Sequence, residues 1–298
     1  MSSRFTQVDL SKLPAPDVIE ALDFEAVLAS MKADVIARLP SLEPVLNLES
    51  EPVTYLLEAF AYREVLLRTR LNDAARAVLL AEAGGTDLEH LAALFGVARL
   101  TIMPADPAAF PPVAAVMEAD VSLRLRAQLA LEGFTTAGSV GAYEFHARSA
   151  DGSIKDVSVS SPAPGSVLVT VLSVVGSGVA DPALLEVVAA AVNSERVRPL
   201  CDLVFVVSAV PVEYDISAAL TIGAGPDGSV VIAAALAALE ALVAERHRIG
   251  LPVRLSAIYA ALHRPGVEEV SLASPLVDIV PALGQAPFCT SISVIAAA

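Results

Sequence analysis

The stretch Ile154-Lys-Asp-Val-Ser-Val-Ser160 is followed by Val167-Leu-Val-Thr-Val-Leu-Ser-Val174, and the two flank Pro162-Ala-Pro-Gly165. Apolar and polar residues alternate, β-branched residues dominate, and a Pro/Gly turn separates the segments, which predicts a β-hairpin. Before residue 151 the apolar residues recur at helical spacing instead. The sequence therefore predicts an α+β fold, with a helical N-terminal region followed by two small α/β sandwich modules.

Two helices are expected at the start of the chain. Residues 23–39 carry apolar positions at helical spacing until Pro40. A longer helix is predicted from Glu51, since no Gly or Pro follows Pro52 until Gly84. About 30 residues at roughly 1.5 Å each give about 45–50 Å, a length that usually packs over more than one neighbour. We expect one apolar stripe along this helix: Val53, Leu56, Leu57, Phe60, Leu67, Leu71, Ala74, Ala75 and Val78.

Weaker signals complete the helical part. Thr86-Asp-Leu-Glu89 matches a capping box and predicts a short helix that Gly96 ends. Four prolines within residues 101–112 predict an ordered crossing or linker. Two more helices are expected over residues 120–131 and 139–150.

The elements after the hairpin suggest two modules. A helix is expected from Asp181 through Val192 and a strand over residues 202–210. A strand over 212–222, helices over 230–247 and 256–262, and strands over 267–272 and 289–295 follow. We therefore expect four parts: an N-terminal helical region over 1–100, a Pro-rich crossing with helices over 101–150, a middle α/β module over 151–210, and a C-terminal α/β module over 211–298.

Charge and composition exclude several classes of function. The chain of 298 residues has a formal net charge of −15. The sequence contains no basic face that could neutralise phosphate, so we expect no nucleic-acid binding. The uncharged run Val230–Leu239 is too short to span a membrane, and the start of the chain lacks the apolar core of a signal peptide. Cys201 and Cys289 predict neither a disulfide nor a zinc site. We expect synthesis in a reducing cytoplasm, without a membrane span, metal or cofactor.

One motif raises an enzymatic alternative. Gly223-Ala-Gly-Pro-Asp-Gly228 matches the glycine pattern that lets a backbone approach pyrophosphate. Pro226 removes a backbone donor, however, and Ser229 suits the N-cap of a following helix. We interpret the stretch as a strand-turn-helix connection, and a nucleotide-binding enzyme that uses it is the less favoured alternative. The histidines are scattered and no G-x-S-x-G elbow occurs, so the sequence does not predict an enzyme.

Fixed charges beside the apolar stripe of the long helix mark a candidate partner interface. They are compatible with plain surface ion pairs or with an interface, because Arg and Tyr are enriched among interface anchors. The candidate residues are Leu56, Phe60, Tyr62, Arg63, Leu67, Arg68, Arg70, Leu71 and Arg76.

Several stretches, in order over about residues 9–215, resemble a known family. They are Asp9-Leu10 with Leu13-Pro14-Ala15-Pro16, Leu48-Glu49-Ser50-Glu51-Pro52, Ala61-Tyr62-Arg63-Glu64 through Arg68, Arg70 and Leu71–Ala77, Gly85–Leu88 with Leu91-Ala92, Ala137-Gly138 with Tyr143, Ser160-Ser161-Pro162 with Gly165, and Val197-Arg198-Pro199-Leu200 with Asp202. They resemble the baseplate J-like family, a wedge component of the baseplate in contractile-tailed bacteriophages and related phage-tail particles. Cys201 stands where that family is expected to have Thr.

The resemblance implies a structural role in baseplate assembly and in its rearrangement on contraction. It implies partners among the wedge subunits: a second tail-wedge protein, a small lysozyme-like sheath-initiating protein, and copies in neighbouring wedges that join around a central spike hub. The long helix would bundle with partner helices, with Arg63, Arg68, Arg70 and Arg76 setting the register. A stand-alone cytoplasmic assembly scaffold is the other alternative, and it predicts no particle-associated copy.

Overall fold

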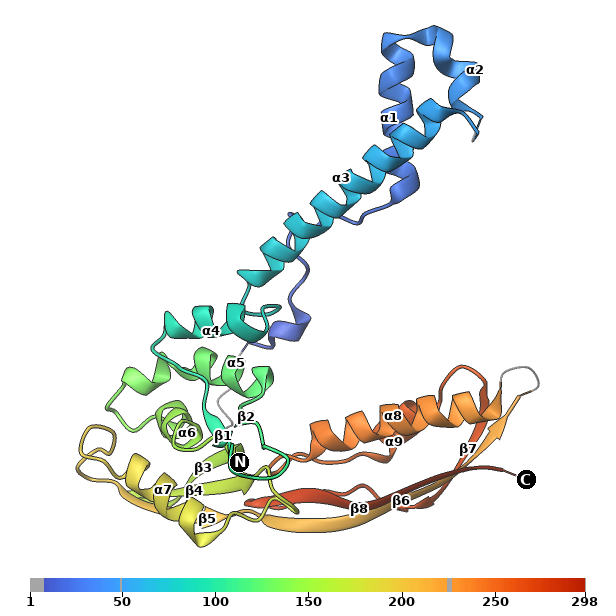
Figure 1. Cartoon of the computed structure of the whole chain (residues 1–298). Coiled ribbons are helices and arrows are strands. Elements are labelled where there is room, and N and C mark those ends of the chain that lie inside the picture. Colours follow the sequence, from blue (N-terminus) through green and yellow to red (C-terminus); the bar gives the residue numbers. More distant parts are fainter. Residues whose placement is uncertain (1–7, 49, 224–226, 298) are drawn as a thin grey trace. The chain divides into compact units, whose positions relative to one another are not determined.

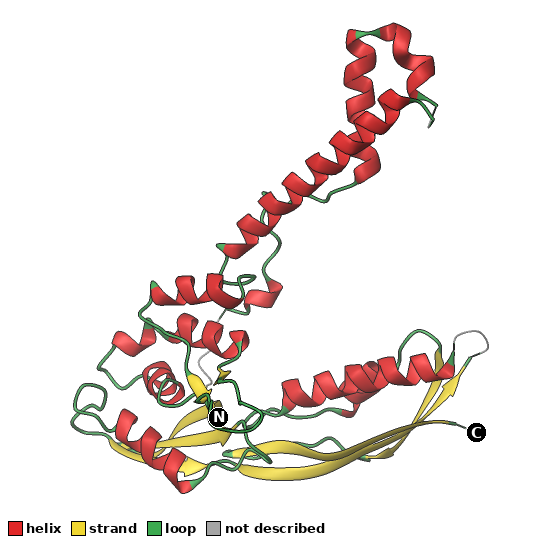
Figure 2. Ribbon diagram, in the orientation of Figure 1, coloured by secondary structure: helices red, strands yellow, loops and turns green. Residues whose placement is uncertain are grey.

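The computed structural model describes residues 8–48, 50–223 and 227–297. The chain divides into two compact units, one over Val8–Leu94 and one that begins at Phe95. Helices make up the first unit, and the strands of both larger sheets lie after residue 150 (Figures 1 and 2). This distribution confirms the predicted α+β class.

The N-terminal unit is built around two helices that pack against each other. Helix α1 (Phe24–Arg38) begins after Asp23, whose side chain accepts a hydrogen bond from the Glu25 N–H, and it lies along α3 (Pro52–Ala77) (Figure 1). Short elements complete the unit: 3₁₀ turns at Leu10–Lys12 and Pro40–Leu42, α2 (Glu43–Leu46) and α4 (Gly85–Ala93). The sequence did not predict α2, since its four residues are too few to show a helical period.

Two predictions for this unit are wrong in detail. The long helix has 26 residues and ends at Ala77, because residues beyond it fold into turns in which Leu79 N–H donates to Arg76 O and Glu82 pairs with Arg76. The Thr86–Glu89 capping box does not form. Helix α4 begins at Gly85, with Gly84 at its N-cap and no side-chain hydrogen bond at that cap.

The Pro-rich segment is a small hairpin where we expected only a crossing. Strand β1 (Thr101–Met103) pairs antiparallel with β2 (Val116–Met117), and an isolated bridge joins Asp106 to Val113. Helices α5 (Asp120–Leu129) and α6 (Val140–Arg148) follow, as expected, and the Ser139 side chain caps α6. The prolines shorten the strands, because a proline cannot donate to a ladder.

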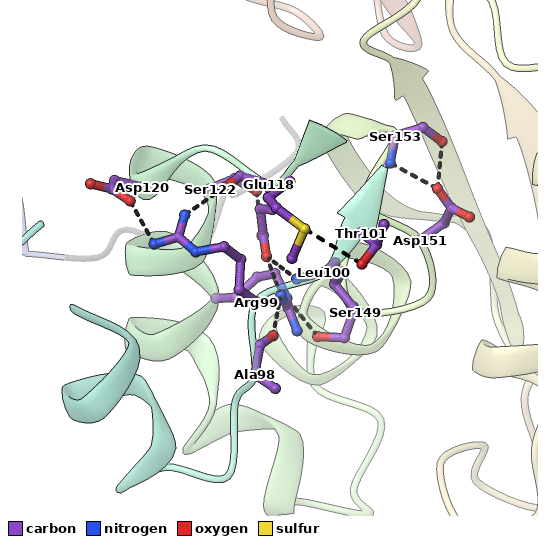
Figure 3. A network of polar contacts seen from close by, with 12 residues as sticks. Ala98, Arg99, Leu100, Thr101, Glu118, Asp120, Ser122, Ser149, Asp151 and Ser153 are labelled. Carbon is purple, nitrogen blue, oxygen red and sulfur yellow. Dashed lines mark hydrogen bonds and ion pairs between the residues drawn. The ribbon is translucent and has the colours of Figure 1, made fainter. Parts of the chain in front are cut away.

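A buried polar network holds the residues before β1 onto α5 (Figure 3). Arg126 donates to a carboxylate oxygen of Glu118 at 2.6 Å, to Ala98 O at 3.2 Å and to Ser149 Oγ at 3.2 Å. The same Glu118 oxygen accepts the Leu100 N–H at 3.0 Å. Both charged side chains are buried, so the pair is stable only while each charge keeps its partner.

The middle module is a three-stranded sheet in the order β3-β4-β5, with helices on one face. Strands β3 (Ile154–Ala163) and β4 (Ser166–Ser173) form the predicted hairpin, and β5 (Leu203–Ser208) runs parallel to β4. Helix α7 (Pro182–Val192), capped by Asp181, packs with α6. The core lies between sheet and helices and contains Tyr143, Ala147, Ile154, Val157, Val159, Val169, Val171, Ala180, Leu184, Val188, Val192 and Val204.

Residues of the family resemblance that are distant in sequence meet in this module. The Tyr143 hydroxyl donates to Asp202 Oδ2 at 2.8 Å, and burial, together with that carboxylate, raises the pKa of Tyr143. Gly138 has φ +72°, and a Cβ there would lie 2.8 Å from both Asp202 and Pro199. Gly138, Tyr143, Pro199 and Asp202 therefore belong to one packing contact.

The C-terminal module is a second small sandwich, in strand order β7-β6-β8. Strand β6 (Val210–Ile222) is central, antiparallel to β7 (Val267–Ser274) and parallel to β8 (Gln285–Ala296). Helices α8 (Gly228–Arg246) and α9 (Leu255–Leu262) cover one face. The core includes Tyr214, Ile216, Ala218, Leu220, Val231, Ala235, Leu239, Val253, Ile258, Ala261, Leu262 and Val267.

Helix α8 begins two residues before the predicted 230 and ends at Arg246, one residue before the predicted end. Asp227, and not Ser229, caps it, because the Asp227 carboxylate accepts the Ser229 N–H at 2.9 Å. The 19-residue helix is long and apolar enough by composition to cross a membrane, which the ten uncharged residues alone did not indicate. In the structure Val231, Ala235 and Leu239 of α8 are buried in the module core.

The two modules share a buried junction. One carboxylate oxygen of Asp156 accepts from the Arg148 guanidinium and the other accepts the Ile249 N–H at 2.9 Å. An apolar cluster of Leu172, Ala209, Ile249 and Ala286 packs at the same junction. Because Asp156 belongs to β3 and Ile249 follows α8, these contacts fix the two modules to each other.

Candidate functional site

The candidate interface lies on α3, which is apolar on two neighbouring sides. Leu57, Ala61 and Ala75 are buried or half-buried on the side that packs on α1, whereas Leu56 and Leu71 are exposed on the neighbouring side. The single apolar stripe that we expected is therefore two rows. A helix that is apolar on two sides has one side left for another partner.

Polar groups pin the inner side of α3 to the chain segment before α1. The Asn72 side chain donates to Glu20 O at 2.9 Å and accepts the Glu20 N–H at 3.1 Å. Arg68 contacts Glu64 one turn away and Glu20 at 3.1 Å. These contacts satisfy the polar side chains that interrupt the inner row.

The outer row is the best-defined part of the candidate site. Leu56, Phe60, Leu67 and Leu71 are 54%, 54%, 65% and 69% exposed. Their spacing of four, seven and four residues places them along one side of a helix with 3.6 residues per turn. A shallow hollow on this side is lined by Ala59, Phe60, Arg63, Leu66, Leu67 and Arg70.

Two arginines interrupt the row with charges that the chain does not neutralise. Arg63 and Arg70 are exposed, and neither forms a hydrogen bond or an ion pair with any residue that the structure describes. They stand three residues after Phe60 and Leu67, so they point to the same side as the row. The outer side of α3 thus combines large apolar groups with available positive charge.

The structure brings together six of the nine predicted residues and separates three. Leu56, Phe60, Arg63, Leu67, Arg70 and Leu71 share the outer side. Arg68 pairs with Glu64 and Glu20, and Arg76 pairs with Asp73 and Glu82, so both arginines have partners inside the unit. Tyr62 is exposed but lies about a quarter turn or more away from the row.

Sequence reasoning missed Leu66 and Ala59, which line the hollow beside Phe60. Ala59 stands three residues after Leu56 and Leu66 three residues after Arg63, so extending the row by steps of three as well as four would have included both.

The other groups singled out in the sequence do not assemble into a reactive site. Among the described residues no group of three His, Cys, Asp or Glu side chains is placed to hold a metal ion. His146 contacts Gly133 O, and burial lowers its pKa; His247 Nδ1 lies 2.9 Å from Lys155 Nζ, and burial followed by that charge lowers the pKa of His247.

Part of the glycine motif, residues 224–226, lies outside the described residues. At its first glycine, a Cβ on Gly223 would lie 2.6 Å from a carboxylate oxygen of Glu268. At its end, Asp227 caps α8. Two carboxylates beside this loop disfavour a phosphate ligand.

Comparison with known proteins places this architecture in a family. The Baseplate J-like N-terminal domain matches residues 49–106, the Baseplate J-like central domain matches 135–208, and the Baseplate J-like protein C-terminal domain matches 214–295. Baseplate protein J of Escherichia phage P2 is 52% identical over 293 residues, which cover 97% of each chain. The likeness thus extends past residue 215, where the sequence motifs end. The chain belongs to the baseplate J-like family and is a structural subunit of a baseplate.

Proposed function

We propose that this chain is a wedge component of the baseplate in a contractile phage tail or phage-tail-like particle, and that the outer side of α3 binds a helix of another baseplate protein. The observation that carries this proposal is the exposed row Leu56, Phe60, Leu67 and Leu71, on a side of α3 that its own packing partner does not cover. Large exposed apolar groups gathered on one side of a helix mark an interaction surface.

The row is suited to a helical partner that carries acidic residues. Each large apolar side chain, when fully buried, contributes about 1.5–3 kcal/mol, so four of them supply most of the gross stabilisation of a helix pair. Arg63 and Arg70 recur at a spacing of seven residues and would pair with carboxylates flanking the partner's apolar seam. Arg68 and Arg76 would instead stiffen the unit through their internal ion pairs.

The partners proposed are those implied by the family: a second tail-wedge protein, the lysozyme-like sheath-initiating protein and copies in neighbouring wedges, with indirect attachment to the central spike hub. Tyr62 would contact a second partner helix, since it points away from the row. We infer synthesis in the host bacterial cytoplasm, followed by incorporation into the tail.

The four-part division over 1–100, 101–150, 151–210 and 211–298 is proposed as a division of labour. The first part would join partners, and the last two, fixed by Asp156 and the apolar junction, would form a rigid connector. Neither enzymatic activity nor a cofactor, metal, nucleic acid or membrane span is part of this function.

Co-expression tests the proposal. The tagged full-length chain is produced with its genomic neighbours, captured and analysed by mass spectrometry. We expect a stoichiometric complex with a second baseplate protein. A partnerless chain that is also absent from tail particles would support the cytoplasmic scaffold instead, and nucleotide binding that Gly225→Asp abolishes would support the enzyme.

A further inference from the structure

The outer edge of the middle sheet is open and carries no charge. In the part of the chain that the structure describes, β5 is paired only with β4, so its other edge has no strand neighbour. The β5 sequence, Leu-Val-Phe-Val-Val-Ser, contains no charged residue, proline or glycine. Natural proteins usually protect an open edge with such residues, because unpaired backbone groups recruit other strands.

The other sheet edges differ from β5. Strand β3 carries Lys155 and Asp156, and β7 carries Glu268 and Glu269. Strand β8 is uncharged but contains Pro287 and a register shift opposite Tyr214 and Asp215, which interrupt a regular edge. Among these edges, β5 is therefore the one that is regular, uncharged and unprotected.

The open face of β5 is also apolar. Leu203, Phe205 and Val207 are 56%, 49% and 38% exposed, while Val204 between them is buried in the module core. Apolar side chains at three alternate positions favour contact with a protein surface over contact with water.

The backbone of β5 offers hydrogen-bonding groups in a defined register. Leu203 N–H donates to Gly165 O and Ala209 N–H donates to Val171 O, both on the β4 side. Successive N–H groups of a strand point to opposite edges. The N–H and C=O groups of Val204, Val206 and Ser208 therefore point toward the open edge.

We propose that the β5 edge pairs with the β5 edge of a second copy of this chain, antiparallel and centred on Phe205. In this register the N–H and C=O groups of Val204 in one copy exchange hydrogen bonds with those of Val206 in the other. These are backbone groups that the pairing with β4 leaves free. Phe205 lies opposite its equivalent, and Leu203 lies opposite Val207. The strand is thus complementary to itself, as a two-fold interface requires.

Charge favours the same register. Asp202, the acidic residue next to β5, falls opposite Ser208, so its carboxylate faces no like charge. Asp202 also keeps its hydrogen bond from Tyr143 within its own module. Two chains that each carry a net charge of −15 repel each other over most of their surfaces, and an uncharged edge is where they can approach.

Cysteine cross-linking in the full-length chain tests the pairing and its register. In a Cys201→Ser background, Phe205→Cys is expected to form a disulfide-linked dimer on mild oxidation, because residues opposite each other without mutual hydrogen bonds have Cα atoms about 4.5 Å apart. A mixture of the Leu203→Cys and Val207→Cys chains should cross-link as well. Val207→Cys alone should not, since its two copies would lie about 14 Å apart.

Sedimentation velocity of the reduced chain gives an independent measure. Phe205→Asp should weaken the dimer about tenfold or more, and Phe205→Thr, which keeps a strand-forming residue, should weaken it less. Leu67→Asp, on α3, should leave the dimer and the cross-link unchanged. A failure of the β5 pairing can therefore be distinguished from a failure of the proposed α3 interface. Equal cross-linking of all three single cysteines, a dimer insensitive to both Phe205 variants, or cross-linking of Phe205→Cys only to a different baseplate protein would overturn the proposal.

Discussion

The outer side of α3 and the core of the C-terminal module use the same kinds of residue in opposite ways. Leu220 and Ile216 on β6 are buried between sheet and helices, whereas Leu67 and Leu71 on α3 are exposed. In Val8–Leu94 the large apolar side chains that are fully enclosed are few, and Leu46 and Leu88 are examples. The comparison teaches that the modules after residue 150 supply their own core, while α3 keeps an apolar side for a partner.

The largest effect on stability is expected at the buried ion pair between Arg126 and Glu118. Arg126→Ala should lower the free energy of unfolding by about 3–5 kcal/mol, because the Glu118 carboxylate would be buried without its cation. Chemical denaturation followed by circular dichroism measures this loss. Arg126→Met combined with Glu118→Gln should recover much of it, and a loss as large in the double variant would contradict the account.

The comparison itself is tested by two matched leucines. Leu220→Ala should destabilise by about 2–5 kcal/mol, because it leaves a cavity in the core. Leu71→Ala, at an exposed site, should change stability by less than about 0.5 kcal/mol in the isolated chain. Equal losses would show that the outer side of α3 is already packed in the free chain.

A smaller and local effect is expected at Asn72. Asn72→Ala should lower the stability of the contact between residue 20 and α3 by about 1–3 kcal/mol, since two main-chain groups of Glu20 lose their partner. Hydrogen exchange should rise in residues 13–23. The peptides of the C-terminal module are the internal control, and faster exchange there would contradict a local role.

The smallest effect concerns pH. Burial lowers the pKa of His247 in the folded chain below its unfolded value of about 6.5. The unfolded chain therefore binds more protons as the pH falls through 6.5, and stability falls in that window. His247→Gln should flatten the decline of the unfolding free energy between pH 7 and 5. His146→Gln should flatten it by a further, independent amount, because burial lowers the pKa of His146 as well. An unchanged slope in both variants would sink this assignment.

Local patterns predicted most elements because the signals are short in range. The hairpin over residues 154–174 and the helix starts at Asp23, Ser139 and Asp181 depend on neighbours within a few residues. The hairpin after residue 101 was not predicted, because prolines hide the alternation of its short strands.

The candidate site could be predicted only in part, for a physical reason. A helical period shows that Leu56, Phe60 and Leu67 share a side, but it does not say which side of α3 the chain itself covers. That choice depends on α1 and on the Asn72 contact with Glu20, which is 52 residues away. The roles of Arg68 and Arg76 depend on distant carboxylates in the same way.

The edge of β5 lies beyond local pattern as well. The sequence predicted a strand over residues 202–210, but strand order decides whether its backbone is covered, and that order is set by the parallel pairing with β4. Without knowledge of the strand order β3-β4-β5, the apolar sequence of this strand would assign Phe205 to the core.

The most direct test of the central claim is assembly with a substituted α3. Leu67→Asp places a charge in the middle of the outer row, and Leu131→Asp makes the same change at a residue of equal exposure, 65%, outside α3. Each variant is tagged, co-expressed with the genomic neighbours and captured. We predict that Leu67→Asp recovers at least about tenfold less of the baseplate partner with residues 151–298 still folded, while Leu131→Asp behaves as wild type. Equal recovery of the partner by both variants, with normal baseplates, would contradict the account.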